Sequence, residues 1–143
     1  GRTARAAIGY QQALRQLVAN TVAAVSPAPK YAVPDVAALG PVPNTRQAID
    51  AYLDRLGQVS RAMQVVQDAY SGALAERDAQ LALVAALRVK ADALGFGTDA
   101  DLSALTAQAE RLLHRRPAPL MVTRQLLPAA QAMLDWLAEA GSR

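Results

Sequence analysis

The sequence predicts an all-α fold, an elongated bundle of four helices around one long coiled-coil-like helix. Three observations predict it. The 143 residues are 52% hydrophobic but only 4% aromatic, and the abundance of Ala and Leu favours helices over sheets. A heptad pattern of mostly apolar residues runs through the middle of the chain. Capping residues, glycines and prolines stand where the helical patterns begin and end.

The first helix is expected at about residues 4–25, with Thr3 as its cap and Ser26-Pro27 as its end. Gln11 belongs to its predicted polar face, together with Gln12, Arg15 and Gln16. The predicted buried stripe consists of Leu14, Leu17, Val18, Thr21, Val22 and Val25.

Residues 26–44 hold five of the eight prolines and several apolar side chains that need cover. This composition predicts an extended strap laid over the bundle, with one helical turn at 35–39 that ends at Gly40. An irregular connection of this length is uncommon and is often functional.

The second helix is expected at 45–94, capped by Asn44 with Gln47 three residues later. Its heptad register holds without an intervening proline, which favours one helix of roughly 75 Å. The alternative is a compact five-helix bundle with a break at Ser71-Gly72. One heptad row contains Ile49, Leu56, Met63, Tyr70, Arg77, Val84 and Ala91, and the other contains Tyr52, Val59, Val66, Ala73, Gln80, Leu87 and Leu94.

Gly95 is expected to end the long helix in a left-handed conformation, with Phe96 packed back on the last turn. The third helix is expected at 98–116, and the fourth at 119–140. Pro128 inside the fourth helix predicts a kink, or a later start at residue 128. The predicted inner residues are Leu102, Leu105, Ala109, Leu112 and Leu113 in the third helix, and Leu120, Leu127, Met133, Leu134 and Leu137, with Trp136 nearby, in the fourth.

The bulk composition excludes several kinds of chemistry. The net charge is +3 and no cysteine is present, so the chain has neither a strongly basic surface for nucleic acid nor thiolate chemistry. No apolar run approaches the roughly 18 residues of a membrane span. The sequence does not indicate the cellular compartment. The protein is cytoplasmic, or extracytoplasmic if the chain belongs to a membrane receptor. The length of 143 residues predicts a single helical domain, 1–143. Because the chain starts without Met, we expect it to be a piece of a larger, bacterial protein.

The only histidine stands in the stretch LLHRRPAP, residues 112–119. Two interpretations compete: an anion contact built from Arg111, His114, Arg115 and Arg116, or cations that stabilise a helix C-terminus. The second is favoured, because cations there bond free carbonyls and offset the helix dipole, whereas phosphate prefers a helix N-terminus. We expect Glu110 and His114 to form a surface pair, not a catalytic one.

Residues 99–110 imitate a calcium loop, but Ala104 stands where the loop needs glycine, so a capped helix is expected instead. No catalytic residue, metal ligand or cofactor site is predicted, and the chain is expected not to be an enzyme. The polar residues Arg77 and Gln80 interrupt the heptad, and three interpretations are open. The stripe widens here and the charged end of Arg77 reaches solvent, or a buried polar layer sets register or partner choice, or one layer of the bundle ends here and another begins.

The expected function is a non-enzymatic helical module for protein–protein interaction or scaffolding. The partner is expected to be another protein or a second copy, not nucleic acid, because short neighbours leave part of the long helix apolar and uncovered. The alternative is a sensory, ligand-responsive domain of a bacterial membrane receptor or signalling protein. The predicted contact residues are Tyr31, Val33, Tyr52, Met63, Tyr70 and Arg77.

Overall fold

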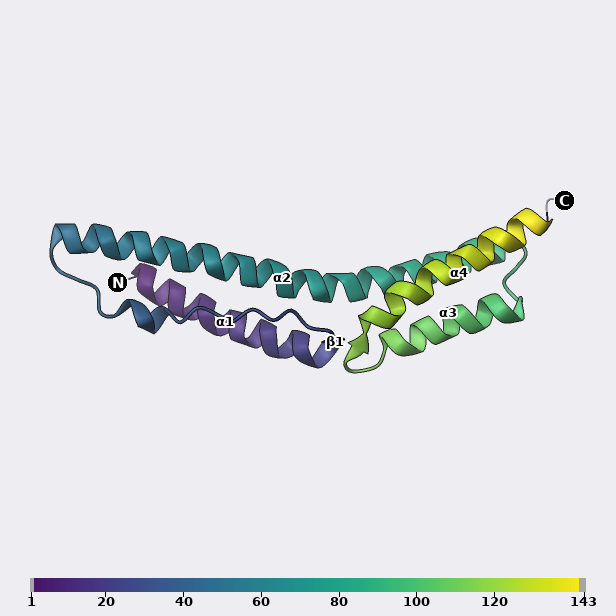
Figure 1. Cartoon of the computed structure of the whole chain (residues 1–143), viewed down its shortest axis with the longest axis horizontal. Coiled ribbons are helices and arrows are strands. Elements are labelled where there is room, and N and C mark those ends of the chain that lie inside the picture. The colour runs from purple at the N-terminus through teal and green to yellow at the C-terminus, as the bar shows by residue number, and fades with distance from the viewer. Residues whose placement is uncertain (1, 142–143) are drawn as a thin grey trace. The chain divides into compact units, whose positions relative to one another are not determined.

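The computed structural model describes residues 2–141 and confirms an all-α helical bundle (Figure 1). Its elements are the helices α1 (Arg2–Ala24), α2 (Arg46–Ala93), α3 (Ala100–Leu113) and α4 (Leu120–Gly141), with a 3₁₀ turn, η1 (Val36–Leu39), and two short strands, β1 (Val25–Ser26) and β2 (Ala118–Pro119). The turn lies within the predicted range 35–39 and is followed by Gly40, as the sequence indicated.

Helix α2 is continuous for 48 residues, so the alternative with a break at Ser71-Gly72 is wrong. The heptad register explains why: the stripe keeps its phase through Gly72, and one glycine costs a helix only about 1 kcal/mol. Every buried residue of α2 stands at a predicted heptad position. These residues are Tyr52, Leu56, Met63, Val66, Tyr70, Gln80, Val84, Leu87 and Ala91.

The ends of the helices correct several predicted caps. Helix α1 begins at Arg2, so Thr3 lies inside it and does not cap it. The hydroxyl of Thr45, not Asn44, accepts a hydrogen bond from the Ala48 N–H at the start of α2. At the other end, Gly95 has φ +87° and the Phe96 N–H bonds the Ala91 carbonyl, which confirms the predicted left-handed end.

The contacts within the chain group the described residues into two compact units. Unit 1 holds the chain up to Thr21 together with Pro29–Gly72, and unit 2 holds Val22–Ala28 and the residues from Ala73 onward. Helices α1 and α2 each contribute to both. The single domain 1–143 stays a prediction, and its residues 1, 142 and 143 lie outside the described ones.

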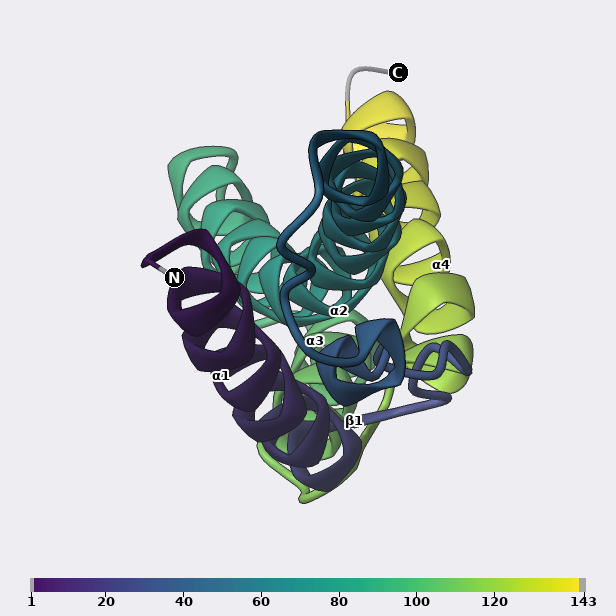
Figure 2. The ribbon, with the colours of Figure 1, turned by 90° about the vertical axis from the view of Figure 1, so that its left-hand side faces the viewer.

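Unit 1 packs α1 and the strap against the first half of α2. Helix α1 runs in the same direction as α2, and α1 and η1 both lie below it in the view of Figures 1 and 2. The strap therefore covers part of the apolar stripe, as predicted. The buried core contains Ala7, Leu14, Val36, Tyr52, Leu56, Met63, Val66 and Tyr70.

Two residues of α1 differ from the prediction. Gln11 is 6% exposed, although the sequence placed it on the polar face. Its side-chain oxygen accepts a 2.6 Å hydrogen bond from the Val36 N–H in η1. This hydrogen bond explains why a polar side chain is buried at this position. Val22 was predicted to be buried but is 53% exposed.

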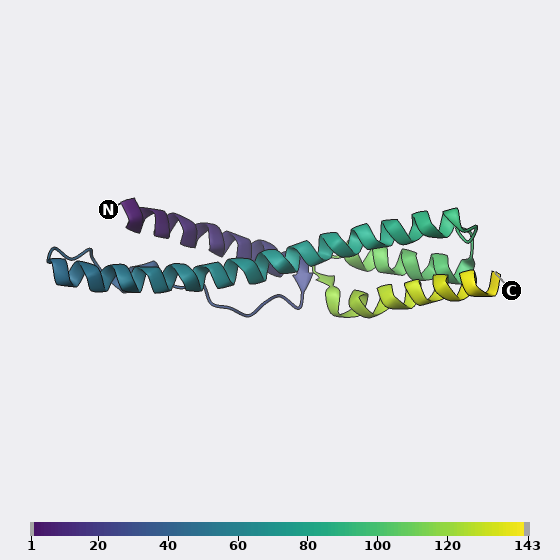
Figure 3. The ribbon, with the colours of Figure 1, turned by 90° about the horizontal axis from the view of Figure 1, so that it is seen from above.

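Unit 2 packs α3 and α4 on the second half of α2. Helix α3 runs opposite to α2, and α4 returns in the direction of α2 (Figure 3). Strand β1 pairs with β2 in parallel, with Val25 opposite Ala118. The buried core contains Ala24, Val25, Val84, Leu87, Ala91, Leu102, Ala109, Leu113, Ala118, Leu120, Leu127, Ala130 and Leu134.

The boundaries of α3 and α4 refine the prediction. Asp99 caps α3 through a 2.9 Å hydrogen bond from the Leu102 N–H, and the helix ends at Leu113 with His114 as its C-cap, three residues before the predicted end. Helix α4 begins at Leu120 and contains Pro128, so the alternative start at residue 128 is wrong.

Candidate functional site

Most of the predicted contact residues lie in the core of unit 1. Tyr52, Met63 and Tyr70 are 5%, 1% and 2% exposed, and Val33 is partly buried against the same cluster. Tyr31 is 53% exposed. The sequence left open whether the strap or a partner covers these residues, and the strap does so in the structure. A partner would therefore reach the three buried side chains only if the strap moved. Their role in partner contact stays a prediction.

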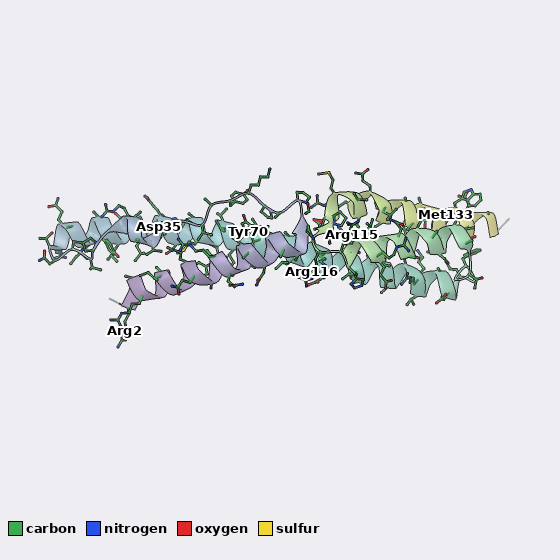
Figure 4. All side chains as sticks on the ribbon, turned by 90° about the horizontal axis from the view of Figure 1, so that it is seen from below. Arg2, Asp35, Tyr70, Arg115, Arg116 and Met133 are labelled. Carbon is green, nitrogen blue, oxygen red and sulfur yellow. The ribbon has the colours of Figure 1, made fainter. Side chains whose placement is uncertain are left out.

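Tyr70 holds the strap through its hydroxyl (Figure 4). The hydroxyl accepts a hydrogen bond from the Tyr31 N–H at 3.2 Å and lies 2.8 Å from the Pro29 carbonyl and 3.1 Å from the Tyr31 carbonyl. An extended segment has no helical hydrogen bonds of its own, so its backbone groups need partners from elsewhere. Tyr70 is therefore both a core residue and an anchor for the strap.

A second polar contact in unit 1 joins α1 to α2. The Tyr10 hydroxyl donates a hydrogen bond to the side-chain oxygen of Gln67. Burial raises the pKa of Tyr10, and the negative charge of Asp68 raises it further. The hydroxyl thus stays protonated at neutral pH and acts as a donor, which suits a structural contact.

Arg77 and Gln80, the two polar residues of the predicted stripe, both contact neighbouring helices of unit 2. The Arg77 Nε donates a 2.9 Å hydrogen bond to the Leu113 carbonyl at the end of α3. Gln80 is 7% exposed, and its side-chain oxygen accepts a hydrogen bond from the Thr123 hydroxyl of α4. These contacts form a polar layer, which was one of the three interpretations of the sequence.

Glu76 extends this layer to the surface. Its carboxylate accepts hydrogen bonds of 2.7 Å from both Nε and Nη2 of Arg124 in α4, and one of 3.0 Å from Gln80. The hydrogen bond from Arg124 lowers the pKa of Glu76, against the opposing effect of partial burial. The two-pronged contact between the guanidinium and the carboxylate joins α4 to α2 with a defined geometry.

Helix α4 of unit 2 carries three large exposed apolar side chains. Met121, Val122 and Trp136 are 57%, 50% and 61% exposed. Trp136, which the sequence placed near the inner residues, therefore points outward. We define the α4 outer face as Met121, Val122, Gln125, Leu126, Ala129, Ala132, Met133 and Trp136, of which none is charged and Leu126 and Met133 are partly buried.

The cations around His114 do not make the contacts that the sequence favoured. His114, Arg115 and Arg116 are exposed after the end of α3 (Figure 4 labels both arginines). Glu110 forms an ion pair with Arg88 of α2, so the expected surface pair with His114 is wrong. The last carbonyl of α3 is bonded by Arg77, a residue that sequence reasoning had not connected with this site.

Within residues 2–141, no helix contains a stretch long and apolar enough to cross a membrane. In the same range, no three side chains of His, Cys, Asp or Glu gather closely enough to hold a metal ion. No protein-family model, curated protein or solved structure matches this chain.

Proposed function

We propose that this protein is a protein–protein interaction module that binds through the α4 outer face. The supporting observation is the exposure of Met121, Val122 and Trp136 along a helix face without charge. Helix α4 already buries Leu120, Leu127 and Leu134 on its inner side. A helix that is apolar on two sides is typical of one with neighbours on both.

Met121, Val122 and Trp136 can each contribute binding energy when a partner covers them. Burying a side chain such as Met or Val stabilises a complex by about 1.5–3 kcal/mol relative to leaving it in water. Trp is enriched among the residues that dominate binding energy at protein interfaces. Single exposed apolar residues are ordinary, but a continuous uncharged row marks an interaction surface.

The occupant that this face fits is a second copy of the same helix, packed antiparallel and centred on Ala129. Val122 and Trp136 each lie seven residues from Ala129, so this pairing places Trp136 of one copy opposite Val122 of the other. A hollow of about 320 Å³ lies there, lined by Val122, Gln125, Leu126 and Ala129. It offers space for an indole ring, while the small Ala129 allows the helices to approach closely.

The arrangement of the face favours the antiparallel pairing. A parallel pairing in register would place Trp136 opposite Trp136 and Val122 opposite Val122, so the hollow beside Val122 would receive no indole ring. The partner implied by the face is therefore a second copy in antiparallel register.

The test is light scattering over a concentration series, combined with emission from Trp136, the single tryptophan. We expect a concentration-dependent dimer whose formation shifts the tryptophan emission to shorter wavelength. Trp136→Ala should weaken the dimer at least ~10-fold, as expected for loss of a central aromatic anchor. Val89→Ala is the matched control, because Val89 is 69% exposed on α2 and lies outside the face. A monomer at all concentrations, with unchanged emission, would contradict the proposal.

A sensory, ligand-responsive domain is the second candidate function. It is supported by one observation, a hollow of about 390 Å³ in unit 2 that is lined by three arginines and His114. Such a lining is suited to a charged small molecule. A ligand that binds this hollow and also changes the association of α4 would favour the sensory function.

A further inference from the structure

A basic hollow lies between the second half of α2 and the end of α3. Its volume is about 390 Å³. Arg88 reaches it from α2, whereas Arg111 comes from the last turn of α3. The lining consists of Arg88, Ala107, Glu110, Arg111, His114 and Arg115, which we call the basic hollow.

The end of α3 does not explain why these cations gather. The carbonyls of Glu110 and Leu112 accept hydrogen bonds from the His114 and Arg115 N–H groups, at 3.1 and 3.2 Å. The carbonyl of Leu113 accepts from Arg77. Backbone N–H groups and a different arginine therefore already occupy the carbonyls of Glu110, Leu112 and Leu113. The side chains of His114 and Arg115 are not used to bond these carbonyls.

Most of the hollow's donors are unused. The Arg111 Nη2 donates a 2.6 Å hydrogen bond to Gln108, which occupies one of its five N–H groups. Among the described residues, no side-chain hydrogen bond or ion pair engages His114 or Arg115. Both are exposed at the mouth of the hollow, and an arginine fork matches the oxygens of a phosphate in bidentate geometry.

Much of the chain's net positive charge is concentrated around the basic hollow. Three arginines and one glutamate leave two net positive charges around this hollow, while the whole chain carries +3. Glu110 is paired with Arg88, so the excess lies on Arg111 and Arg115. Like charges held close together are destabilising, and a bound anion removes that cost. The α3 dipole opposes an anion here, but its effect is small at an exposed helix end and is screened by salt.

We propose that the basic hollow binds a phosphate group, either as free phosphate or as a phosphate monoester on a small molecule. Arg111 and Arg115 supply the charge-assisted hydrogen bonds to its oxygens. Arg88 holds the Glu110 carboxylate in an ion pair and so offsets its negative charge beside the bound phosphate. His114 adds a ring N–H donor at the mouth. This site is separate from the α4 outer face, so either proposal can fail alone.

The test is an NMR titration of the whole chain with inorganic phosphate, and in parallel with phenyl phosphate, at constant ionic strength set by chloride. The probes are the ring signals of His114, the only histidine, and the guanidinium signals of the arginines. We expect saturable shifts at His114, Arg111 and Arg115. Equal binding of both ligands identifies the phosphate group as sufficient, and tighter binding of phenyl phosphate identifies a monoester as the preferred form.

Variants separate a site from general attraction to a positive protein. The double variant Arg111→Gln with Arg115→Gln should weaken phosphate binding at least ~10-fold, because it removes charge-assisted hydrogen bonds. The matched control is Arg55→Gln with Arg61→Gln, which removes the same charge from exposed positions of α2 in unit 1. Circular dichroism verifies that both variants are folded. Linear shifts without saturation, or equal weakening in both double variants, would overturn the proposal.

Discussion

Units 1 and 2 cover one heptad stripe in two different ways. In unit 1, the neighbours of α2 are α1 and an irregular strap, and the polar contacts to that strap run from side chains to its backbone. Tyr70 bonds the strap at Pro29 and Tyr31. In unit 2, the neighbours are two helices, and the contacts of α2 with α4 run between side chains. Gln80 bonds Thr123, and Glu76 bonds Arg124.

The two units differ because the neighbours of α2 differ in how many of their own backbone N–H and carbonyl groups they satisfy. A helix satisfies its own N–H and carbonyl groups except at its ends, so its partners need to supply only packing and register. A strap satisfies few of its own groups, so side chains of neighbouring helices must serve them. Tyr70 and Gln11 perform that task in unit 1, and Arg77 has a comparable task only at the end of α3.

The largest effect is expected from Tyr70→Phe. This substitution keeps the buried ring but removes the hydroxyl that holds the strap, so we expect the free energy of unfolding to fall by about 1–3 kcal/mol. Hydrogen exchange should accelerate at Tyr31, whose N–H loses its acceptor. Tyr31→Phe is the control, because no side-chain hydrogen bond of Tyr31 is seen among the described residues. Equal loss of stability in both variants would show that the hydroxyl does not anchor the strap.

Smaller changes in stability are expected when Gly72 within α2 and Gly95 just after it are replaced by alanine. The two changes should have opposite signs. Gly72 lies within the helix and Gly95 has φ +87°, and an added Cβ would meet no atom within 4 Å at either position. Gly72→Ala should therefore stabilise the chain by about 0.5–1 kcal/mol through helix propensity. Gly95→Ala should destabilise it by about 1 kcal/mol through backbone strain.

Thermal or urea unfolding measures both glycine variants, and each serves as the control for the other. Because neither position has a steric conflict, the backbone conformation alone decides the sign. Destabilisation by Gly72→Ala would mean that α2 bends at Gly72 in solution. That result would also mean that the two units do not share one continuous stripe.

The smallest effect is expected from Glu76→Gln in unit 2. The folded-state pKa of Glu76 is lowered, chiefly by the hydrogen bond from Arg124. The ion pair therefore stabilises the fold at pH values above the ordinary pKa of glutamate, and this contribution disappears as the pH falls through the lowered value. The Arg124 side chain is 50% exposed, so the contribution should be below about 1 kcal/mol.

Urea unfolding at about pH 7 and about pH 3 measures this contribution. The wild type should be slightly more stable than Glu76→Gln at the higher pH, and the difference should shrink at the lower one, because the carboxyl group becomes protonated as the pH falls. Asp54→Asn removes the same charge from an exposed position of unit 1 where the structure shows no ion pair among the described residues. The same pH-dependent difference in that variant would argue for a general charge effect.

Much of the fold was predictable because its determinants are local. Heptad spacing fixed the face of α2, Gly95 marked its end, and the prolines excluded a regular helix between α1 and α2. The turn at Val36–Leu39 could be predicted for the same reason, since Asp35 caps it and Gly40 follows it. Thr3 and Asn44 were wrong as caps because helix ends depend on which neighbouring group offers the better hydrogen bond.

The sequence by itself determined the helices and the stripe that organises them, because periodicity and capping act within a few residues. Only the tertiary structure decided which groups meet across that stripe. It buried Gln11 beneath η1, turned Trp136 outward, and brought Arg88 to the end of α3. Periodicity identifies a face of a helix but not the neighbour that covers it. Both candidate sites depend on that neighbour, because one is a face left uncovered and the other is a hollow between two helices.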